Sequence, residues 1–290
     1  MGRCFFVADL HGDAARYRRL FAAMAAERPD AVFLGGDLLP PAFGGGRLGP
    51  GDDQQSFIEH VLAPGFAAVR DGAGARTARV FLIPGNDDCR CVEEALAAPP
   101  DGVWEYLHGR RALLGTVPVY GYAYVPPTPF RLKDWERYDV SRYVDPGCSA
   151  PAEGLHTVAV EEREMEWATI REDLDTLAGG DDLARAVFLF HAPPYQTPLD
   201  RAALDGVRVD HVPLDVHVGS IAIRRFIEAR QPRVTLHGHV HESARLSGAW
   251  RERLGRTHCL SAAHDGPELS LVRFDPEAPE DAARELLAVD

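Results

Sequence analysis

Five short apolar segments of this sequence are each followed at once by residues that can bind a metal ion. The segments are 4–8, 31–34, 80–83, 186–190 and 234–236, and the residues that follow them are Asp9 and His11, Asp37, Asn86, His191, and His239 and His241. Such short runs of β-branched and aromatic residues are typical of strands that are buried on both faces. Because ligands of open α/β sheets bind at the carboxyl ends of strands, we expect these side chains to meet at one edge of the fold.

Carboxylate and imidazole groups together suit manganese, iron or zinc better than calcium. None of the five cysteines lies among these residues, which disfavours a structural zinc centre. A single aspartate between a strand and a helix is more often a helix cap than a ligand. Asp9 and Asp37, however, occur together with the ordered histidines named above. The pattern therefore predicts a metal-dependent hydrolase.

Helical spacing of apolar residues alternates with these strands. It predicts helices over 13–27, 54–69, 161–177 and 219–229, with Ser220 as a candidate cap of the last. Alternation of this kind predicts a sheet covered by helices. Residues 256–261 and 268–274 have the pattern of antiparallel strands, which suggests a second sheet.

The sequence predicts one domain over residues 1–274 and a peripheral tail over 275–290. The tail is acidic and rich in alanine, so we expect a short helix with no chemical role. Two segments, 38–53 and 124–156, are rich in proline with glycine or aromatic residues and have no clear periodicity. Loops of this length in a compact domain are usually functional, so we expect them to form the rim of the site.

The composition limits the classes of molecule that the protein is expected to bind. The 290 residues include 31 basic and 44 acidic side chains, and the formal charge of −13 disfavours broad binding to nucleic acid or acidic lipid. The cysteines form no CxxC pair and suggest no disulfide framework, and no segment approaches the roughly 18 apolar residues that a membrane span needs. We expect a cytoplasmic protein that acts on a small molecule; the oligomeric state stays open.

Taken in chain order, the candidate ligands form a series of motifs. These are Asp-x-His at Asp9 and His11, Gly-Asp at Asp37, Gly-Asn-x-Asp over 85–88, a single His191, and Gly-His-x-His ending at His241. This series, from Asp9 to His241, resembles the calcineurin-like metallophosphoesterase superfamily. Residues 191–195 and 217–242 are similar to the small prokaryotic phosphoesterases within it. The resemblance implies an α/β fold, a β-sandwich of two mixed sheets flanked by helices in α/β/β/α layers.

The resemblance also implies two divalent metal ions per chain, which would be manganese, iron or zinc. The first ion would be bound by Asp9, His11, Asp37 and His241, and the second by Asp37, Asn86, His191 and His239. Asp37 would bridge the two ions, and a bridging carboxylate can hold two cations about 3.5–4 Å apart for phosphoester cleavage. Asn86 is neutral, so the centre would keep positive charge for an anionic substrate.

The implied function is a metal-dependent phosphoesterase. It would hydrolyse phosphodiester or small phosphomonoester bonds through a hydroxide that the two metals activate. The alternative is a metal-binding interaction module on the same fold with little catalytic activity. The complete ligand set favours the enzyme, because a decayed site would be free to lose ligands.

One residue departs from the family pattern. Many members carry a histidine between the asparagine and the acid, where it contacts the phosphate and assists the leaving group. Here that position is Asp87, followed by Asp88. A carboxylate facing a phosphate would need to be protonated or paired with an arginine such as Arg90. We expect Asp87 and Asp88 to be the catalytic side chains, with Asp87 either donating a proton or only ordering Asp88.

Overall fold

The computed structural model describes residues 2–42, 51–74 and 77–289. Its strands are β1 (Cys4–Val7), β2 (Ala31–Gly35), β3 (Arg79–Ile83), β4 (Glu105–Tyr106), β5 (Arg110–Leu114), β6 (Val117–Tyr122), β7 (Val187–Phe190), β8 (Arg208–Val209), β9 (Val212–Pro213), β10 (Val234–His237), β11 (Arg251–Leu254), β12 (Thr257–Ser261), β13 (Leu269–Phe274) and β14 (Ala283–Leu287). Its α-helices are α1 (Ala14–Glu27), α2 (Asp52–Phe57), α3 (Ala63–Ala73), α4 (Glu93–Ala97), α5 (Glu162–Trp167), α6 (Ile170–Ala178), α7 (Ile221–Arg230) and α8 (Ser243–Ser247). Part of the expected rim loop, residues 43–50, lies outside the described residues. No helix within the described ranges is long and apolar enough to cross a membrane.

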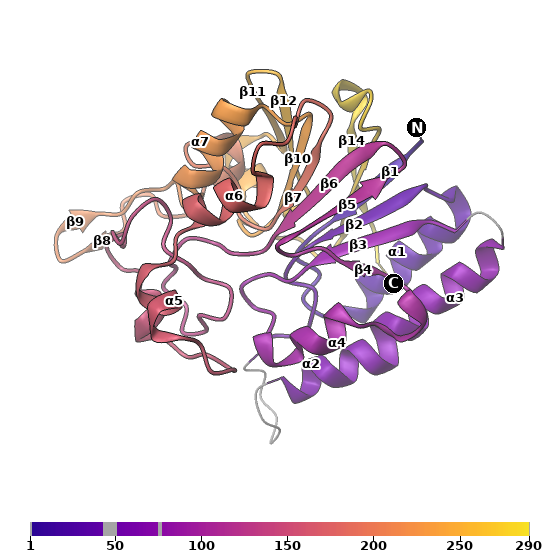
Figure 1. Ribbon diagram of the computed structural model, residues 1–290, viewed down its shortest axis with the longest axis horizontal. Coiled ribbons are helices and arrows are strands. Elements are labelled where there is room, and N and C mark those ends of the chain that lie inside the picture. Colours follow the sequence, from indigo (N-terminus) through magenta and orange to yellow (C-terminus); the bar gives the residue numbers. More distant parts are fainter. Residues whose placement is uncertain (1, 43–50, 75–76, 290) are drawn as a thin grey trace.

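Two mixed sheets of six strands each form the centre of the molecule. The strand orders are β14-β13-β1-β2-β3-β4 and β11-β12-β10-β7-β6-β5. Strands β1 to β4 run parallel in the first sheet, and β6, β7, β10 and β12 run parallel in the second. Helices α1 and α3 cover the outer side of the first sheet, and α6 and α7 that of the second (Figure 1). The expected sandwich in α/β/β/α layers is confirmed.

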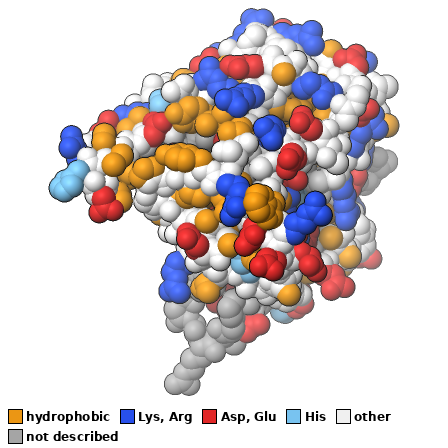
Figure 2. Space-filling view, turned by 60° about the vertical axis from the view of Figure 1, so that its left-hand side comes forward, with side chains coloured by type: hydrophobic (Ala, Val, Ile, Leu, Met, Phe, Trp, Pro, Cys, Tyr) orange, Lys and Arg blue, Asp and Glu red, His pale blue; other side chains and the backbone are white. Residues whose placement is uncertain are grey.

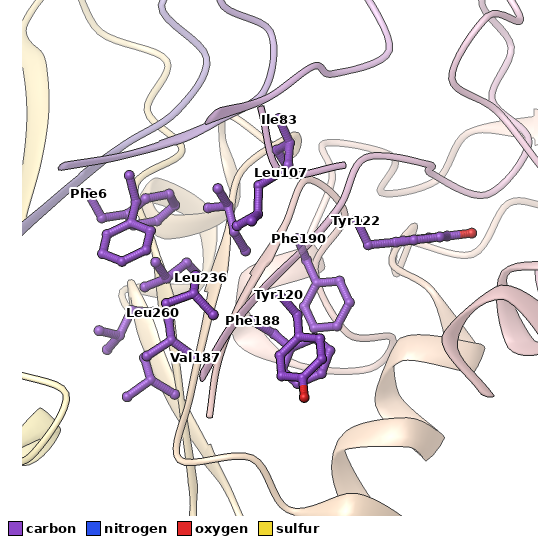
Figure 3. Close-up of a cluster of buried hydrophobic side chains, with 14 of the residues drawn as sticks. Phe6, Ile83, Leu107, Tyr120, Tyr122, Val187, Phe188, Phe190, Leu236 and Leu260 are labelled. Atoms are coloured by element: carbon purple, nitrogen blue, oxygen red, sulfur yellow. The ribbon is translucent and has the colours of Figure 1, made fainter. Parts of the chain in front are cut away.

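Strand β1 shows how the sheets acquire two buried faces. Its side chains alternate, so that Phe5 and Val7 join the core beneath α1 and α3, whereas Phe6 joins the core between the sheets. Figure 3 shows Phe6 in this second core together with Leu236 and Leu260 of the other sheet. Burial on both faces stabilises such a strand by roughly 1.5–3 kcal/mol per large side chain. It also fixes the register that places Asp9 at the end of the strand.

The expected helices near the site begin where the sequence indicates. Asp13 caps α1 by accepting hydrogen bonds from the amides of Ala15 and Arg16. Ser220 caps α7 by accepting from the amide of Ile223. These caps start each helix directly beside a metal-binding motif, and each contributes about 1 kcal/mol.

Two expectations about secondary structure were wrong, and a third is confirmed only in part. The helix expected over 161–177 is interrupted at Ala168 and Thr169, because the amide of Ile170 donates to the carbonyl of Tyr138 and Thr169 caps a new helix, α6. The C-terminal tail forms strand β14, antiparallel to β13, instead of a helix. The antiparallel pairing expected of residues 256–261 and 268–274 is found between β12 and β11 and between β13 and both β1 and β14. However, β12 also pairs in parallel with β10, and β13 belongs to the first sheet and not to the second.

His108 makes stability depend on pH. Its ring contacts Tyr122 and Trp135, and its Nδ1 accepts a hydrogen bond from the amide of Ala123. Burial, followed by the charge of nearby arginines, lowers the pKa of His108 from 6.5 to about 3. The unfolded chain therefore takes up this proton first, so the stabilisation is complete above pH 6.5 and is lost as the pH falls toward 3.

When the pH is lowered from neutral to about 5.5, protonation of His108 in the unfolded chain should reduce the free energy of unfolding by about 1 kcal/mol. Urea titrations of the wild type and of His108→Gln at both pH values measure the effect. The variant should lose less stability on acidification than the wild type. An identical loss in both proteins would show that His108 does not carry this pH dependence.

Candidate metal centre

The predicted ligands lie at the carboxyl ends of strands from both sheets. Their donor atoms form two groups within which all atoms lie within 4.8 Å of one another. The first group is Asp9, His11, Asp37 and His241, and the second is Asp37, His191 and His239. A contact of 2.7 Å between His191 Nδ1 and the carbonyl of Gly35 joins the two sheets at this point. Asp37 belongs to both groups.

The first group has the features of a cation-binding site. His11 Nε2 lies 3.1 Å from His241 Nε2, and His241 Nε2 lies 3.6 Å from Asp9 Oδ1. Asp9 is only 2% exposed, and its buried Oδ2 has no hydrogen-bond partner among the described residues. A buried carboxylate oxygen without a partner costs free energy, and a bound cation would remove that cost.

The second group is built around His191, which is fully buried. Its Nδ1 donates to the carbonyl of Gly35, so Nε2, which lies 3.4 Å from Asp37 Oδ2, is the nitrogen that could bind a metal once it loses its proton. The same Nε2 lies 3.0 Å from Asn86 Oδ1, which adds the predicted amide ligand to this group. A histidine whose other nitrogen is fixed by a carbonyl is the usual form of a metal ligand.

The charges of the site also fit bound cations. Burial opposes the imidazolium form, but the carboxylates, Asp37 foremost, raise the pKa of His191 to about 9. Burial likewise opposes a charged His11, yet its pKa is raised to about 9, with the Asp87 carboxylate as the largest favourable contribution. Burial opposes ionisation of Asp37, yet His191 and His11 hold its pKa below the usual range. In the protein without metal, protons on these imidazoles thus balance the carboxylates, and metal ions would displace them.

Four of the predicted ligands have unusual backbone conformations. Asp9, His11, Asp37 and His239 have φ values of 57°, 47°, 50° and 75°. Non-glycine residues rarely adopt this left-handed region, which costs of order 1 kcal/mol or more at each position. The strain is concentrated where the chain must turn side chains inward at the ends of β1, β2 and β10.

The loop that follows β3, residues 84–89, carries Asn86 and is called the metal loop below. Gly85 allows this loop to approach Asp37. A Cβ at this position would lie 2.3 Å from both the amide nitrogen and Oδ1 of Asp37. We expect Gly85→Ala to destabilise the fold by about 1–3 kcal/mol and to lower metal content, because the carboxylate of Asp37, a candidate ligand in both groups, must move. Thermal unfolding and metal analysis measure both effects. Gly72→Ala is the matched control, since a Cβ there has no neighbour within 4 Å; equal behaviour of the two variants would contradict this role.

Asp88 and Asp87 differ in their surroundings. Asp88 is fully buried, and its carboxylate accepts hydrogen bonds from the amides of Gly85, Leu38 and Leu39. Burial, and then the charge of Asp37, raise the pKa of Asp88 to about 7. Asp88 thus ties the loop after β3 to the loop after β2. The side chain of Asp87 is partly exposed and has Oδ2 3.4 Å from His11 Nδ1.

Arg90 makes ion pairs with Glu93 and Glu164, at 3.4 Å and 3.5 Å. Its guanidinium also lies over the ring of Trp135. Arg90, named above as an example of an arginine that could pair with Asp87, makes no such pair among the contacts of the described residues. Arg90 instead connects the metal loop to α5 and to the 124–156 segment, because its amide donates to Asp134 at 2.7 Å.

Gln54 is a site residue that sequence reasoning missed. It is buried, its Nε2 donates to the carbonyls of Pro40 and Asp87, and its Oε1 accepts from the amide of Cys89. Gln54 therefore holds the metal loop on both sides of Asp88. The available signal was its place on the same helical face as Phe57, Ile58 and Val61, where a polar side chain needs buried partners.

The comparison with known proteins agrees with this geometry. The family model for calcineurin-like phosphoesterases matches residues 2–243. The chain therefore belongs to the calcineurin-like phosphoesterase family, whose members are metal-dependent phosphoester hydrolases. No curated protein sequence matches it.

Solved structures show the same fold at low identity. The protein TT1561 of Thermus thermophilus is 16% identical with a TM-score of 0.57, and the similarity covers 99% of both chains. A dimetal phosphatase from Danio rerio is 13% identical with a TM-score of 0.50, over 93% of this chain and 91% of that one. At these identities the similarity concerns the fold alone.

Proposed function

We propose that this protein hydrolyses phosphodiester or small phosphomonoester bonds at two divalent metal ions, which would be manganese, iron or zinc. The observation that supports this most directly is the position of Asp37, whose carboxylate belongs to both groups of candidate ligands. The Danio rerio protein of similar fold, a dimetal phosphatase, agrees with this interpretation. The first ion would be held by Asp9, His11, Asp37 and His241, and the second by Asp37, Asn86, His191 and His239.

When bound, the two ions would supply Lewis acidity and an activated hydroxide for attack on phosphorus. The residues of the chain fix where that chemistry can occur. The carboxylates of Asp9 and Asp37 neutralise only part of the charge of two divalent ions, and Asn86 adds none. The centre therefore keeps positive charge that attracts a phosphate and stabilises the charge that develops during attack.

Asp88 acts in this proposal as a positioning residue. Both of its oxygens accept hydrogen bonds from backbone amides, so it holds the loops that carry Asp37 and Asn86. It has no free oxygen with which to transfer a proton to a leaving group. Its effect on catalysis would come through the placement of the ligands.

A small substrate suits the surface better than nucleic acid. The net charge is −13, and acidic and basic side chains are interspersed over the face that Figure 2 shows. A broad nucleic-acid site needs a basic patch or stripe instead. The segment 124–156 is tied to the metal loop through Asp134 and Arg90, which supports a place for part of this rim beside the centre.

Hydrolysis of bis-p-nitrophenyl phosphate and p-nitrophenyl phosphate tests the proposal. Protein stripped with a chelator should be inactive and should regain turnover when manganese is added. Faster hydrolysis of the diester would make the protein a phosphodiesterase, and faster hydrolysis of the monoester a phosphatase. Bound manganese without turnover of either compound would favour the alternative, a metal-binding interaction module. Failure to bind manganese would contradict both.

A further inference from the structure

Asp87 stands where many family members have a histidine, and its carboxylate is turned toward a metal ligand. We propose that Asp87 positions His11 for the first metal ion and raises the affinity of the chain for that ion. This inference rests on the proposed function, because it concerns the same centre. It gives Asp87 a structural task in place of proton donation to the substrate.

The two nitrogens of the His11 ring have different neighbours. Nε2 faces the first ligand group, 3.1 Å from His241 Nε2 and 3.9 Å from Asp37 Oδ2. Nδ1, on the other side of the ring, lies 3.4 Å from Asp87 Oδ2. An acceptor at Nδ1 keeps the proton on that nitrogen and leaves the lone pair of Nε2 free for a metal.

His11 needs such a partner because regular structure does not hold it. It follows the end of β1 and has φ of 47°, in the left-handed region. Its side chain is partly exposed, unlike that of His191, whose Nδ1 is fixed by the buried carbonyl of Gly35. The carboxylate of Asp87 would orient His11 through its Nδ1, as the carbonyl of Gly35 orients His191 through its Nδ1. Each metal site would then have a ligand histidine oriented through its Nδ1.

The backbone of Asp87 is fixed well enough to serve this purpose. Its amide donates to Asp37 Oδ1 at 2.8 Å, and its carbonyl accepts from Gln54 Nε2 at 2.9 Å. Gln54 is itself buried and held by Pro40 and Cys89. The direction in which the Asp87 side chain leaves the loop is therefore set by contacts on both sides. The same residue orients the bridging carboxylate through its amide and His11 through its side chain.

Carboxylates that orient a ligand histidine typically contribute 10–100-fold to metal affinity. We therefore expect Asp87→Ala to weaken binding of one of two Mn²⁺ ions by roughly this factor and to leave the other nearly unchanged. Asp87→Asn should lose less, because its amide oxygen can still accept from Nδ1. Calorimetric titration of chelator-stripped full-length protein with Mn²⁺ measures both affinities. Asp71→Ala, which removes an aspartate whose side chain is 73% exposed, is the matched control.

A second measurement reads His11 directly. In Zn²⁺-loaded protein, ¹⁵N NMR of the histidine side chains should show His11 bound through Nε2 with a proton on Nδ1, and Asp87→Ala should change the Nδ1 signal. Two Mn²⁺ affinities in Asp87→Ala equal to those of the wild type would overturn the inference while leaving the proposed function intact. A wild type that binds no Mn²⁺ would overturn both. Thermal unfolding of each variant confirms that the fold is retained.

Discussion

Replacement of Asp37 by asparagine should abolish most of the hydrolytic activity. The carboxylate belongs to both groups of candidate ligands, and an amide cannot supply the negative charge that holds two cations together. Loss of several kcal/mol of stabilisation corresponds to a decrease in kcat/KM of roughly 10³-fold. The metal content should fall at the same time. Steady-state hydrolysis of an activated phosphodiester and metal analysis of the purified variant measure the two effects.

Asp71→Asn is the control for this experiment, because Asp71 lies on the surface beside Arg70 and outside both ligand groups. It should keep both activity and metal. Because the substitution takes a carboxylate partner from His191 and His11, thermal unfolding of Asp37→Asn must accompany the activity measurement. An Asp37→Asn variant with full activity and unchanged metal content would show that the ligand assignment is wrong.

Aryl phosphodiesters should be hydrolysed much faster than alkyl ones. The histidine that would assist the leaving group is replaced by Asp87, whose carboxylate contacts His11, and Asp88 is occupied by backbone amides. If neither Asp87 nor Asp88 donates a proton, an alkoxide must leave without their assistance, whereas a phenolate leaves readily. General acid catalysis typically accelerates a reaction about 10²–10⁴-fold. The ratio of aryl to alkyl hydrolysis rates should therefore exceed, by roughly this factor, the ratio in an enzyme that has such a proton donor.

A series of diesters that differ only in the acidity of the leaving group measures this dependence. The rate should fall steeply as the pKa of the leaving alcohol rises. Asp87→His, which restores the residue of many family members, should flatten the slope if the ring reaches the substrate. Similar rates for matched aryl and alkyl diesters in the wild type would contradict the account and would indicate another proton donor.

Much of the centre could be predicted because the ligands follow their strands directly. Residues Phe5 to Val7 are buried on both faces of the sheet. This apolar pattern indicates where β1 ends, and it therefore places Asp9 just after the end of the strand. The same reasoning placed His191 after β7 and Asp37 after β2. That the two sheets would face each other came from the family resemblance, since the contact between His191 and Gly35 joins residues 156 positions apart.

The edges of the sheets were harder to foresee. Strand β14 has the sequence Ala-Arg-Glu-Leu-Leu, which favours a helix locally, but pairing with β13 overrides this preference. Strand β5 begins with two exposed arginines, and β6 contains Pro118 and Gly121, so neither has the apolar run of a central strand. In each case the deciding interaction comes from a neighbouring strand, which local propensity does not reveal.

The contacts that orient the ligands also escaped sequence reasoning. Asp87 was recognised as a departure from the family, but its partner His11 lies in another loop, and Gln54 reaches its carbonyl from a separate helix. Side-chain partners of this kind depend on how loops pack against one another. The sequence motifs identify the candidate ligands. The residues that orient those ligands are determined by how the loops pack, which the motifs do not reveal.

Diffraction from crystals of the manganese-loaded protein, measured with the anomalous signal of that metal, would locate the bound ions. Two anomalous peaks should appear about 3.5–4 Å apart, with a carboxylate oxygen of Asp37 in contact with both. One peak should lie beside His11 and His241, and the other beside His191 and His239. A single peak, or peaks that do not touch Asp37, would contradict the proposed two-metal centre.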